Sequence, residues 1–199
     1  VFTNTGQTIA VQHTSKLDLN DGVTVDGGTL QTAGTGVINQ LGVAGGAVLN
    51  NVTVAGTVVQ ANSKDSTITG SLTNNGTWNL NSTGVATDLN FNGGITLSGT
   101  GEIVMSDNTQ NRIITNSTLL TQAASHTIRG AGQLLANTGG MINNGTIRQE
   151  GATAMTVDPN ALGFTNQGTM QATGAGGFVF SPGVFTNTGQ TIDVQHTSN

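Results

Sequence analysis

The sequence predicts an all-β protein, a right-handed parallel β-helix or β-solenoid of about eight coils of roughly 23 residues each. Three observations lead to this fold class. The composition suits strands and tight turns, a six-residue motif with a glycine recurs along the chain, and short runs of alternating apolar and polar residues follow these glycines. Alternation with a period of two is typical of strands that bury one face.

The composition favours strands joined by tight turns. The 199 residues include 34 Thr, 30 Gly and 22 Asn, whereas only 8% of residues are charged and only two are proline. Thr and Val favour strands, and Gly and Asn favour turns. A disordered linker is the alternative for such a chain, but disordered segments usually carry more charge and lack regular apolar positions. Here 35% of residues are hydrophobic and they recur throughout, which favours a folded chain.

The recurring motif marks the corners of the predicted coils. It reads apolar, polar, Asn, any residue, Gly, then Thr or Gln. Its copies are FTNTGQ (2–7), LTNNGT (72–77), MINNGT (141–146), FTNQGT (164–169) and FTNTGQ (185–190). Looser copies are LQTAGT (30–35), VTVAGT (52–57), LSGTGE (97–102) and IRGAGQ (128–133). Successive glycines lie 13 to 31 residues apart, most of them 20 to 25 apart, which is the spacing of a solenoid coil.

Each motif is expected to join two strands through a tight turn. Alternating runs follow the glycine, as in TIAV (8–11), TWNL (77–80), EIVM (102–105) and TMQA (169–172), and they are too short for helices. Gly accepts a positive φ and Asn tolerates the left-handed region, so both residue types suit the turn. One coil cannot bury its apolar face alone, so the coils must stack with parallel strands around a shared interior.

The asparagines and glycines of the motif are the residues expected to define the corners. They are Asn4, Gly6, Asn74, Gly76, Asn143, Gly145, Asn166, Gly168, Asn187 and Gly189. Asparagines that stack at one corner of successive coils can form a hydrogen-bonded ladder. Alternatively, each Asn is only a turn former whose side chain points to water. Both interpretations stay open at this point.

The chain closes on the sequence with which it opens. Residues 1–16 (VFTNTGQTIAVQHTSK) and 184–199 (VFTNTGQTIDVQHTSN) are identical at 14 of 16 positions. The differences are Ala10 against Asp193 and Lys16 against Asn199. We interpret residues 1–183 as one β-solenoid repeat unit and residues 184–199 as the start of the next, near-identical unit. Residue 184 is then expected to take the place of residue 1, translated along a fibre axis with or without a rotation, and the neighbouring unit is the expected partner, end to end.

Charge and residue types exclude several classes of function. The net charge is −5 and the five basic residues are scattered, which argues against binding to nucleic acids or anionic membranes. No apolar run approaches transmembrane length. The absence of cysteine excludes disulfides, thiolate metal ligands and thiol nucleophiles. His13 and His196 repeat one site and His126 stands alone, so surface or turn positions are favoured over a zinc site, and no cofactor is expected.

The carboxylates are dispersed, which argues against an enzyme. Parallel β-helices also host polysaccharide lyases and hydrolases, whose sites need clustered carboxylates. The one local group is LDLNDG (17–22), where Asp18, Asn20 and Asp21 could offer oxygens to calcium, but a solvated turn is the favoured interpretation. We therefore expect no catalytic, metal or cofactor site. A carbohydrate-binding or carbohydrate-active β-helix is the alternative function, and it predicts that Asp18, Asp21, Asp26, Trp78 and Asp88 share one face.

Trp78 is the one residue singled out as a candidate for ligand contact. It lies in the alternating run TWNL, and an exposed ring there would offer a platform on which a sugar could stack. A Trp buried at a corner of the core is the commoner arrangement. The register of the strand decides between the two, because neighbouring residues of a strand point to opposite faces.

Two further patterns predict features of the surface. The glycines of LSGTGE and IRGAGQ, Gly101 and Gly132, lie 31 residues apart, and extra length in one coil usually emerges as a loop. We expect that loop within residues 106–112 or 119–126. Ice binding by flat threonine arrays is a third, weaker hypothesis, because the runs VTV (23–25), VTV (52–54) and TIT (67–69) are not spaced as a regular ladder.

Longer strings of the sequence resemble a known class of proteins. FTNQGTMQATGAGGFVF (164–180), LTNNGTWNLNSTG (72–84) and GGMINNGTIRQEG (139–151) resemble the repetitive passengers of large bacterial surface proteins, such as filamentous-haemagglutinin-like adhesins and autotransporter passengers. The resemblance covers essentially the whole chain as texture and motif. It implies export, folding outside the cell and a long fibre that serves adhesion, biofilm or envelope structure, with surface glycans or other cells as further partners. The expected function is thus a structural and adhesive repeat of an extracellular bacterial filament.

Overall fold

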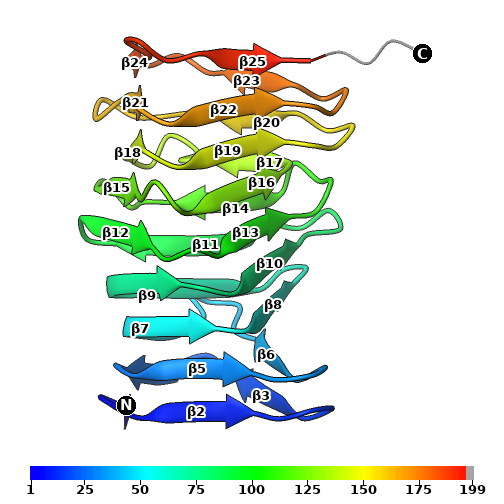
Figure 1. Ribbon diagram of the computed structural model, residues 1–199, viewed down its shortest axis with the longest axis vertical. Coiled ribbons are helices and arrows are strands. Elements are labelled where there is room, and N and C mark those ends of the chain that lie inside the picture. Colours follow the sequence, from blue (N-terminus) through cyan, green and yellow to red (C-terminus); the bar gives the residue numbers. More distant parts are fainter. Residues whose placement is uncertain (196–199) are drawn as a thin grey trace.

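The chain folds into a stack of β-strand coils along one axis (Figure 1). The computed structural model describes residues 1–195, and in these residues it has 25 strands and no helix. Every strand pair is parallel and joins one coil to the next, with registers that advance by 19 to 25 residues per coil, as in Trp78 opposite Val58 and Ile103 opposite Ile128. The predicted β-solenoid and its coil length are therefore confirmed.

Each coil contributes one strand segment to each of three walls that run along the axis. The first wall contains β1 (Phe2–Thr3), β4 (Thr24–Asp26), β7 (Ala47–Ala55), β9 (Asp65–Asn74), β11 (Thr87–Asn92), β14 (Asn111–Ile114), β17 (Gly132–Leu134), β20 (Met155–Val157) and β23 (Phe178–Phe180). The second wall contains β2 (Thr8–Val11), β5 (Thr29–Thr32), the later halves of β7 and β9, β12 (Ile95–Ser98), β15 (Leu119–Gln122), β18 (Gly140–Asn143), β21 (Phe164–Asn166) and β24 (Phe185–Thr186).

The third wall is a separate sheet of nine strands. It contains β3 (Lys16–Leu19), β6 (Val37–Gln40), β8 (Thr57–Ala61), β10 (Thr77–Asn81), β13 (Glu102–Met105), β16 (Thr127–Gly130), β19 (Thr146–Gln149), β22 (Thr169–Ala172) and β25 (Ile192–Val194). The first two walls form one 16-stranded sheet, because β7 and β9 run through both. Each wall thus has nine strand segments within the described residues.

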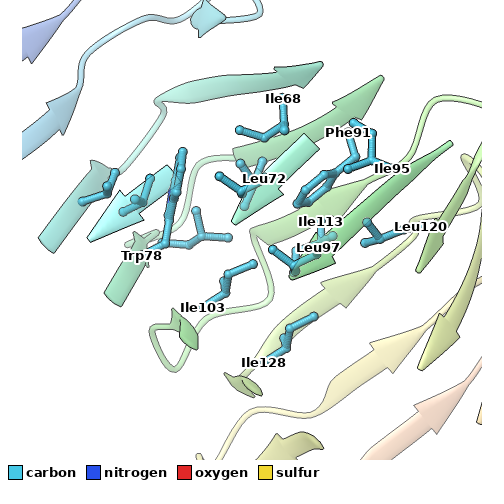
Figure 2. Close-up of a cluster of buried hydrophobic side chains, with 14 of the residues drawn as sticks. Ile68, Leu72, Trp78, Phe91, Ile95, Leu97, Ile103, Ile113, Leu120 and Ile128 are labelled. Carbon is cyan, nitrogen blue, oxygen red and sulfur yellow. The ribbon is translucent and has the colours of Figure 1, made fainter. Parts of the chain in front are cut away.

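The inward side chains of the three walls form one continuous apolar core. Alternation along the strands produces it: in β13, Ile103 and Met105 are buried while Glu102 and Val104 are only partly covered. Figure 2 shows the middle of this core, where Trp78 and other apolar side chains meet between the walls. Full burial of a Leu, Ile or Phe side chain contributes about 1.5–3 kcal/mol, so this interior stabilises the stack of coils.

The motif glycines serve the corners in two different ways. Gly6 and Gly189 have φ of +70° and +74°, as the turn prediction requires. Gly76, Gly145 and Gly168 do not have a positive φ, so the expectation is wrong for them. A Cβ added at any of these three would lie 2.0 to 2.3 Å from a main-chain oxygen of the preceding coil, so glycine is needed there for close stacking of the backbones.

The two copies of the terminal sequence occupy different walls. In the first copy, β1 lies in the first wall, where Phe2 is opposite Val25, and β2 lies in the second wall. In the second copy, β24 lies in the second wall, where Phe185 is opposite Phe164, and β25 lies in the third. The second copy therefore lies one wall further around the coil than the first, so the translation along the axis is combined with a rotation by one wall. The wall in which each copy lies is decided by the strand of the neighbouring coil with which it pairs, and not by its own sequence.

The loop predicted between Gly101 and Gly132 is absent from the described structure. Of the two segments proposed for it, residues 119–122 form β15 within the second wall, and residues 106–110 form a five-residue corner between β13 and β14. The Asp107 carboxylate in this corner accepts from the Ala152 and Thr153 N–H groups at 3.0 and 2.7 Å, two coils further along. The coil that starts there spans 25 residues, since Glu102 is opposite Thr127. The long spacing arises because Gly132 lies in β17 rather than at the corner that contains Gly101.

Candidate functional site

Three of the five motif asparagines form a ladder at the end of the second wall. The Asn143 amide nitrogen donates to Oδ1 of Asn166 at 2.8 Å, and the Asn166 nitrogen donates to Oδ1 of Asn187 at 2.7 Å. The Asn187 nitrogen donates to the carbonyl oxygen of Gln190 at 2.9 Å. Asn143 and Asn166 are buried. Side-chain amides stacked in this way pair with one another inside the stack and hold successive coils in register.

The other two motif asparagines lie outside this ladder. The ladder column continues from Asn143 through Gln122 and Leu97 to Leu72, which places Asn74 two residues beyond it. The Asn74 amide instead accepts from the Gly76 N–H at 3.2 Å and donates to the Glu102 carbonyl oxygen at 3.0 Å. The Asn4 amide bonds only within its own turn, to the Gln7 carbonyl oxygen at 3.2 Å. One motif therefore supports two kinds of corner.

His126 closes a turn, which is one of the two expected positions, since its N–H donates to the Ala123 oxygen at 3.1 Å, but it is buried inside the solenoid rather than at the surface. Its Nε2 lies 3.1 Å from the amide nitrogen of Asn74. Burial lowers the pKa of His126 to about 4, although the nearby Glu102 carboxylate opposes that shift. The imidazole is therefore neutral at pH 7. His13 lies in an exposed turn with φ of +48°, and His196 lies outside the described residues.

Trp78 is fully buried, so the possible ligand platform at this residue is contradicted. Its ring lies in the core between the walls (Figure 2), and its Nε1–H donates to Oε1 of Gln60 at 3.3 Å. The indole has both an apolar environment and a partner for its one donor, which is the usual arrangement of a buried Trp. It presents no face to a sugar.

The acidic residues near LDLNDG connect coils and do not converge on a common ion. Asp18 accepts from the Asn39 amide at 2.7 Å, and its pKa is lowered by that hydrogen bond and by Lys16. Asp21 accepts from the Val43 N–H at 2.9 Å, and Asp26 accepts from the Asn50 amide at 2.7 Å. No group of three or more His, Asp or Glu within residues 1–195 could hold a metal ion.

The residues that a carbohydrate site would need are not gathered on one face. Asp18 lies in the third wall, whereas Asp26 and Asp88 lie in the first wall, three coils apart. Asp88 is paired with Arg112, whose Nε–H donates to Oδ1 at 2.6 Å. Trp78, the aromatic residue of this set, is buried.

An ion-pair row on the third wall was not predicted from the sequence. The Arg129 guanidinium donates to both oxygens of Glu102, at 2.7 and 3.0 Å, and to Glu150 at 3.0 Å. Arg148 also pairs with Glu150. Arg129 lowers the pKa of Glu102 through its hydrogen bond. The four charges link β13, β16 and β19, and only the register could reveal them because they come from three successive coils.

Threonines form columns that the spacing of the three TxT-like runs did not show. Thr8, Thr29, Thr53 and Thr73 are register partners on successive coils of the second wall, and Thr73 bonds to Ser98 through its hydroxyl at 3.0 Å. The runs 23–25, 52–54 and 67–69 do not form one ladder, as expected, because Thr24 and Thr67 lie in the first wall and Thr53 lies in the second. No second threonine column runs beside this one, because the residues two positions further along the strands are Ala10, Gln31 and Ala55. A flat array of paired threonines does not form there.

The terminal coils of the described chain expose core-type side chains. At one end, an apolar hollow is lined by Phe2, Ile9, Leu17, Leu19, Val23 and Val25. At the other end, the Phe180 and Phe185 rings meet edge to face with centroids 5.0 Å apart, and Phe180 is 42% exposed. The sequence did not predict these two surfaces, because apolar residues at the equivalent positions of the middle coils are buried by the next coil.

The described residues contain no helix long and apolar enough to cross a membrane. The chain was also compared with protein-family models, with curated proteins and with solved structures, and none of the three comparisons gave a match.

Proposed function

We propose that the chain is a structural and adhesive repeat of an extracellular bacterial fibre, in which neighbouring units continue the solenoid end to end. The observation that carries this proposal is the arrangement of the terminal coils. Their strands β1–β3 and β23–β25 each pair on one edge only, and apolar side chains of these coils, such as Phe2 and Phe180, are exposed. Unpaired strand edges are templates for pairing with another chain.

The two ends are in phase around the axis, which favours continuation. Because every wall has nine strand segments, β23, β24 and β25 present the same three walls as β1, β2 and β3. A second copy that moves along the axis without rotation continues all three walls. At about 4.8 Å per strand, nine coils advance the fibre by roughly 43 Å.

The side surface suits an isolated, hydrated fibre. The outward positions of the walls are mostly Thr, Asn and Gln. The charged side chains among the described residues form five ion pairs. The closed coil has its strand edges only at its two ends, so lateral sheet pairing is disfavoured while axial pairing is open. Adhesion, an extracellular location and contact with surface glycans or other cells are proposed from the resemblance to bacterial surface passengers.

Sedimentation velocity and electron microscopy of the 199-residue protein test the end-to-end contact. We expect linear oligomers that grow with concentration and have an axial repeat near 43 Å. Phe180→Glu places a charge on the terminal coil and should abolish growth. Val85→Glu is the matched control, because Val85 is 52% exposed at a corner in the middle of the stack. Stable monomers at high concentration, or equal loss of growth in both variants, would contradict the proposal.

A further inference from the structure

We propose that the edge of β21 and β22 that faces the end of the stack is a docking surface for the sequence VFTNTGQTI. Residues 184–194 fill it within the chain as β24 and β25. Residues 1–11 of a second copy can fill it in their place. The inference uses the self-association of the proposed function, but different residues carry it, and it describes an exchange of segments between copies rather than contact between intact ends.

The docking surface recognises an aromatic ring, a side-chain amide and two apolar residues. The Phe164 and Phe185 ring centroids are 6.2 Å apart, and Asn166 donates to Asn187 at 2.7 Å. In β22, Met170 is opposite Ile192 and Ala172 is opposite Val194. Main-chain bonds close both ends of the segment, from the Phe164 N–H to the Val184 oxygen at 2.8 Å and from the Gln195 N–H to the Ala172 oxygen at 2.9 Å.

The first segment of the chain has every side chain that this surface recognises. The counterparts of Phe185, Asn187, Ile192 and Val194 are Phe2, Asn4, Ile9 and Val11. The one difference within the segment is Ala10 in place of Asp193. Asp193 lies opposite Gln171, and Ala10 in its own place lies opposite Gln31, so both positions have a glutamine as neighbour. Either residue is therefore accommodated in either place.

The turn within the segment has one conformation in both places. The Gln7 N–H donates to the Asn4 oxygen at 2.9 Å, and the Gln190 N–H donates to the Asn187 oxygen at 3.2 Å. The side-chain amide of each Asn also donates to the carbonyl oxygen of that Gln. A segment that already has its bound shape loses little conformational entropy when it docks, which favours exchange.

Both copies of the segment are held weakly at the ends of the stack. β1 and β2 pair only with β4 and β5, and β24 and β25 pair only with β21 and β22. Exposure is high at Phe2, Val184 and Val194, at 56%, 65% and 64%. If the displaced residues 184–194 then dock on β4 and β5 of the second copy, the number of paired strands is unchanged. Exchange of an identical element is a low-cost route to association.

Disulfide cross-linking between two single-cysteine variants tests the exchange, because the natural chain has no cysteine. Thr165 lies opposite Thr186 across β21 and β24, and Thr3 is the counterpart of Thr186. We expect Thr165→Cys mixed with Thr3→Cys to give a disulfide-linked dimer, several-fold above the yield with the control donor Thr100→Cys, an exposed corner residue. Equal yields would overturn the inference.

Two further arms separate this inference from simple stacking. Contact between intact ends places β3 on β25 in the register of the third wall, so Asp18→Cys would link to Asp193→Cys. That link, without one between Thr3→Cys and Thr165→Cys, would overturn the exchange and leave the fibre proposal standing. In the double variant Thr165→Cys/Thr186→Cys, oxidation forms a disulfide that holds residues 184–194 of the same chain on β21. A labelled VFTNTGQTIAV peptide should bind this protein when reduced and lose binding when oxidised. Equal binding in both states would also overturn the inference.

Discussion

Gln60 shows how single polar residues are accommodated inside the solenoid. Its side chain is fully buried, and its nitrogen donates to the carbonyl oxygens of Lys64 and Asp88 at 2.6 and 2.8 Å. Its oxygen accepts from Ser66 at 2.8 Å and from Trp78. The partners come from its own coil and from later coils, so the polar group is satisfied only once the stack has formed. A buried polar group without such partners is destabilising by about 1–3 kcal/mol.

The asparagine ladder leads to a prediction at the same scale. Asn166→Ala should lower the free energy of unfolding by about 1–3 kcal/mol, because the Asn143 nitrogen loses its side-chain acceptor and Oδ1 of Asn187 loses its donor. Urea denaturation followed by far-UV circular dichroism measures the change. Asn20→Ala is the control, since the Asn20 side chain is exposed and makes no hydrogen bond within residues 1–195, and it should be nearly neutral. Equal losses in both variants would show that the ladder adds no stability.

Buried His126 should make stability depend on pH. Its pKa is about 4 in the folded chain against an ordinary value of 6.5, so the unfolded chain takes up the proton first as the pH falls. The stabilisation is fully present above pH 6.5 and is lost as the pH falls through 4, by about 3 kcal/mol in total. His126→Gln should flatten this part of the stability curve, and His13→Gln should not. Parallel curves for the wild type and His126→Gln would contradict the assignment.

At the scale of strands and corners, the backbone rather than the side chains sets the closest contacts. A Cβ on Gly168 would lie 2.1 Å from the carbonyl oxygen of Gly145, and one on Gly76 would lie 2.0 Å from that of Gly56. Corners of successive coils therefore stack glycine on glycine. At Gly6, by contrast, the space for a Cβ is open and only the positive φ favours glycine. The two kinds of corner should respond differently to substitution.

Alanine substitutions distinguish these corners. Gly168→Ala should destabilise the chain by about 3 kcal/mol or more, because two coils must separate to make room. Gly6→Ala should have a smaller effect of about 1–2 kcal/mol, because the left-handed conformation is strained for alanine but nothing is displaced. Thermal unfolding of both variants measures the difference. A larger loss for Gly6→Ala would contradict the distinction.

At the scale of the whole molecule, each coil contacts mainly the coil before and the coil after. Strand pairs join only successive coils, from β1 and β4 at one end to β20 and β23 at the other. The stability of such a stack is approximately a sum of coil and interface contributions. The terminal coils have one neighbour each, so they are expected to open before the middle.

Trp78 lies near the middle of the stack and reports on it (Figure 2). We expect its fluorescence transition at a higher denaturant concentration than the loss of far-UV circular dichroism, because the terminal coils unfold first. Hydrogen exchange should agree, with fast exchange in β1–β3 and β23–β25 and slow exchange in β8–β13. Coincident transitions by both probes would instead indicate one cooperative unit.

The sequence predicted the architecture because the relevant signals are local. Period-two runs, turn residues and a spacing near 20 to 25 residues each concern a single coil, and together they specify stacked parallel strands. The candidate residues were harder to place. Trp78, His126 and the row around Arg129 depend on which strand faces which, and a shift of one residue would turn each side chain to the other face.

The terminal sequence separates what the chain determines locally from what the stack decides. The turns at residues 4–7 and 187–190 share two hydrogen bonds between the Asn and the Gln and the same glycine conformation, because the partners of these bonds lie within the turn itself. The strands on either side of these turns nevertheless lie in different walls. The sequence by itself thus determined the strands, the turns and the solenoid. Only the tertiary structure decided the register, the wall and the ladder, since a strand pairs with whatever edge the neighbouring coil presents.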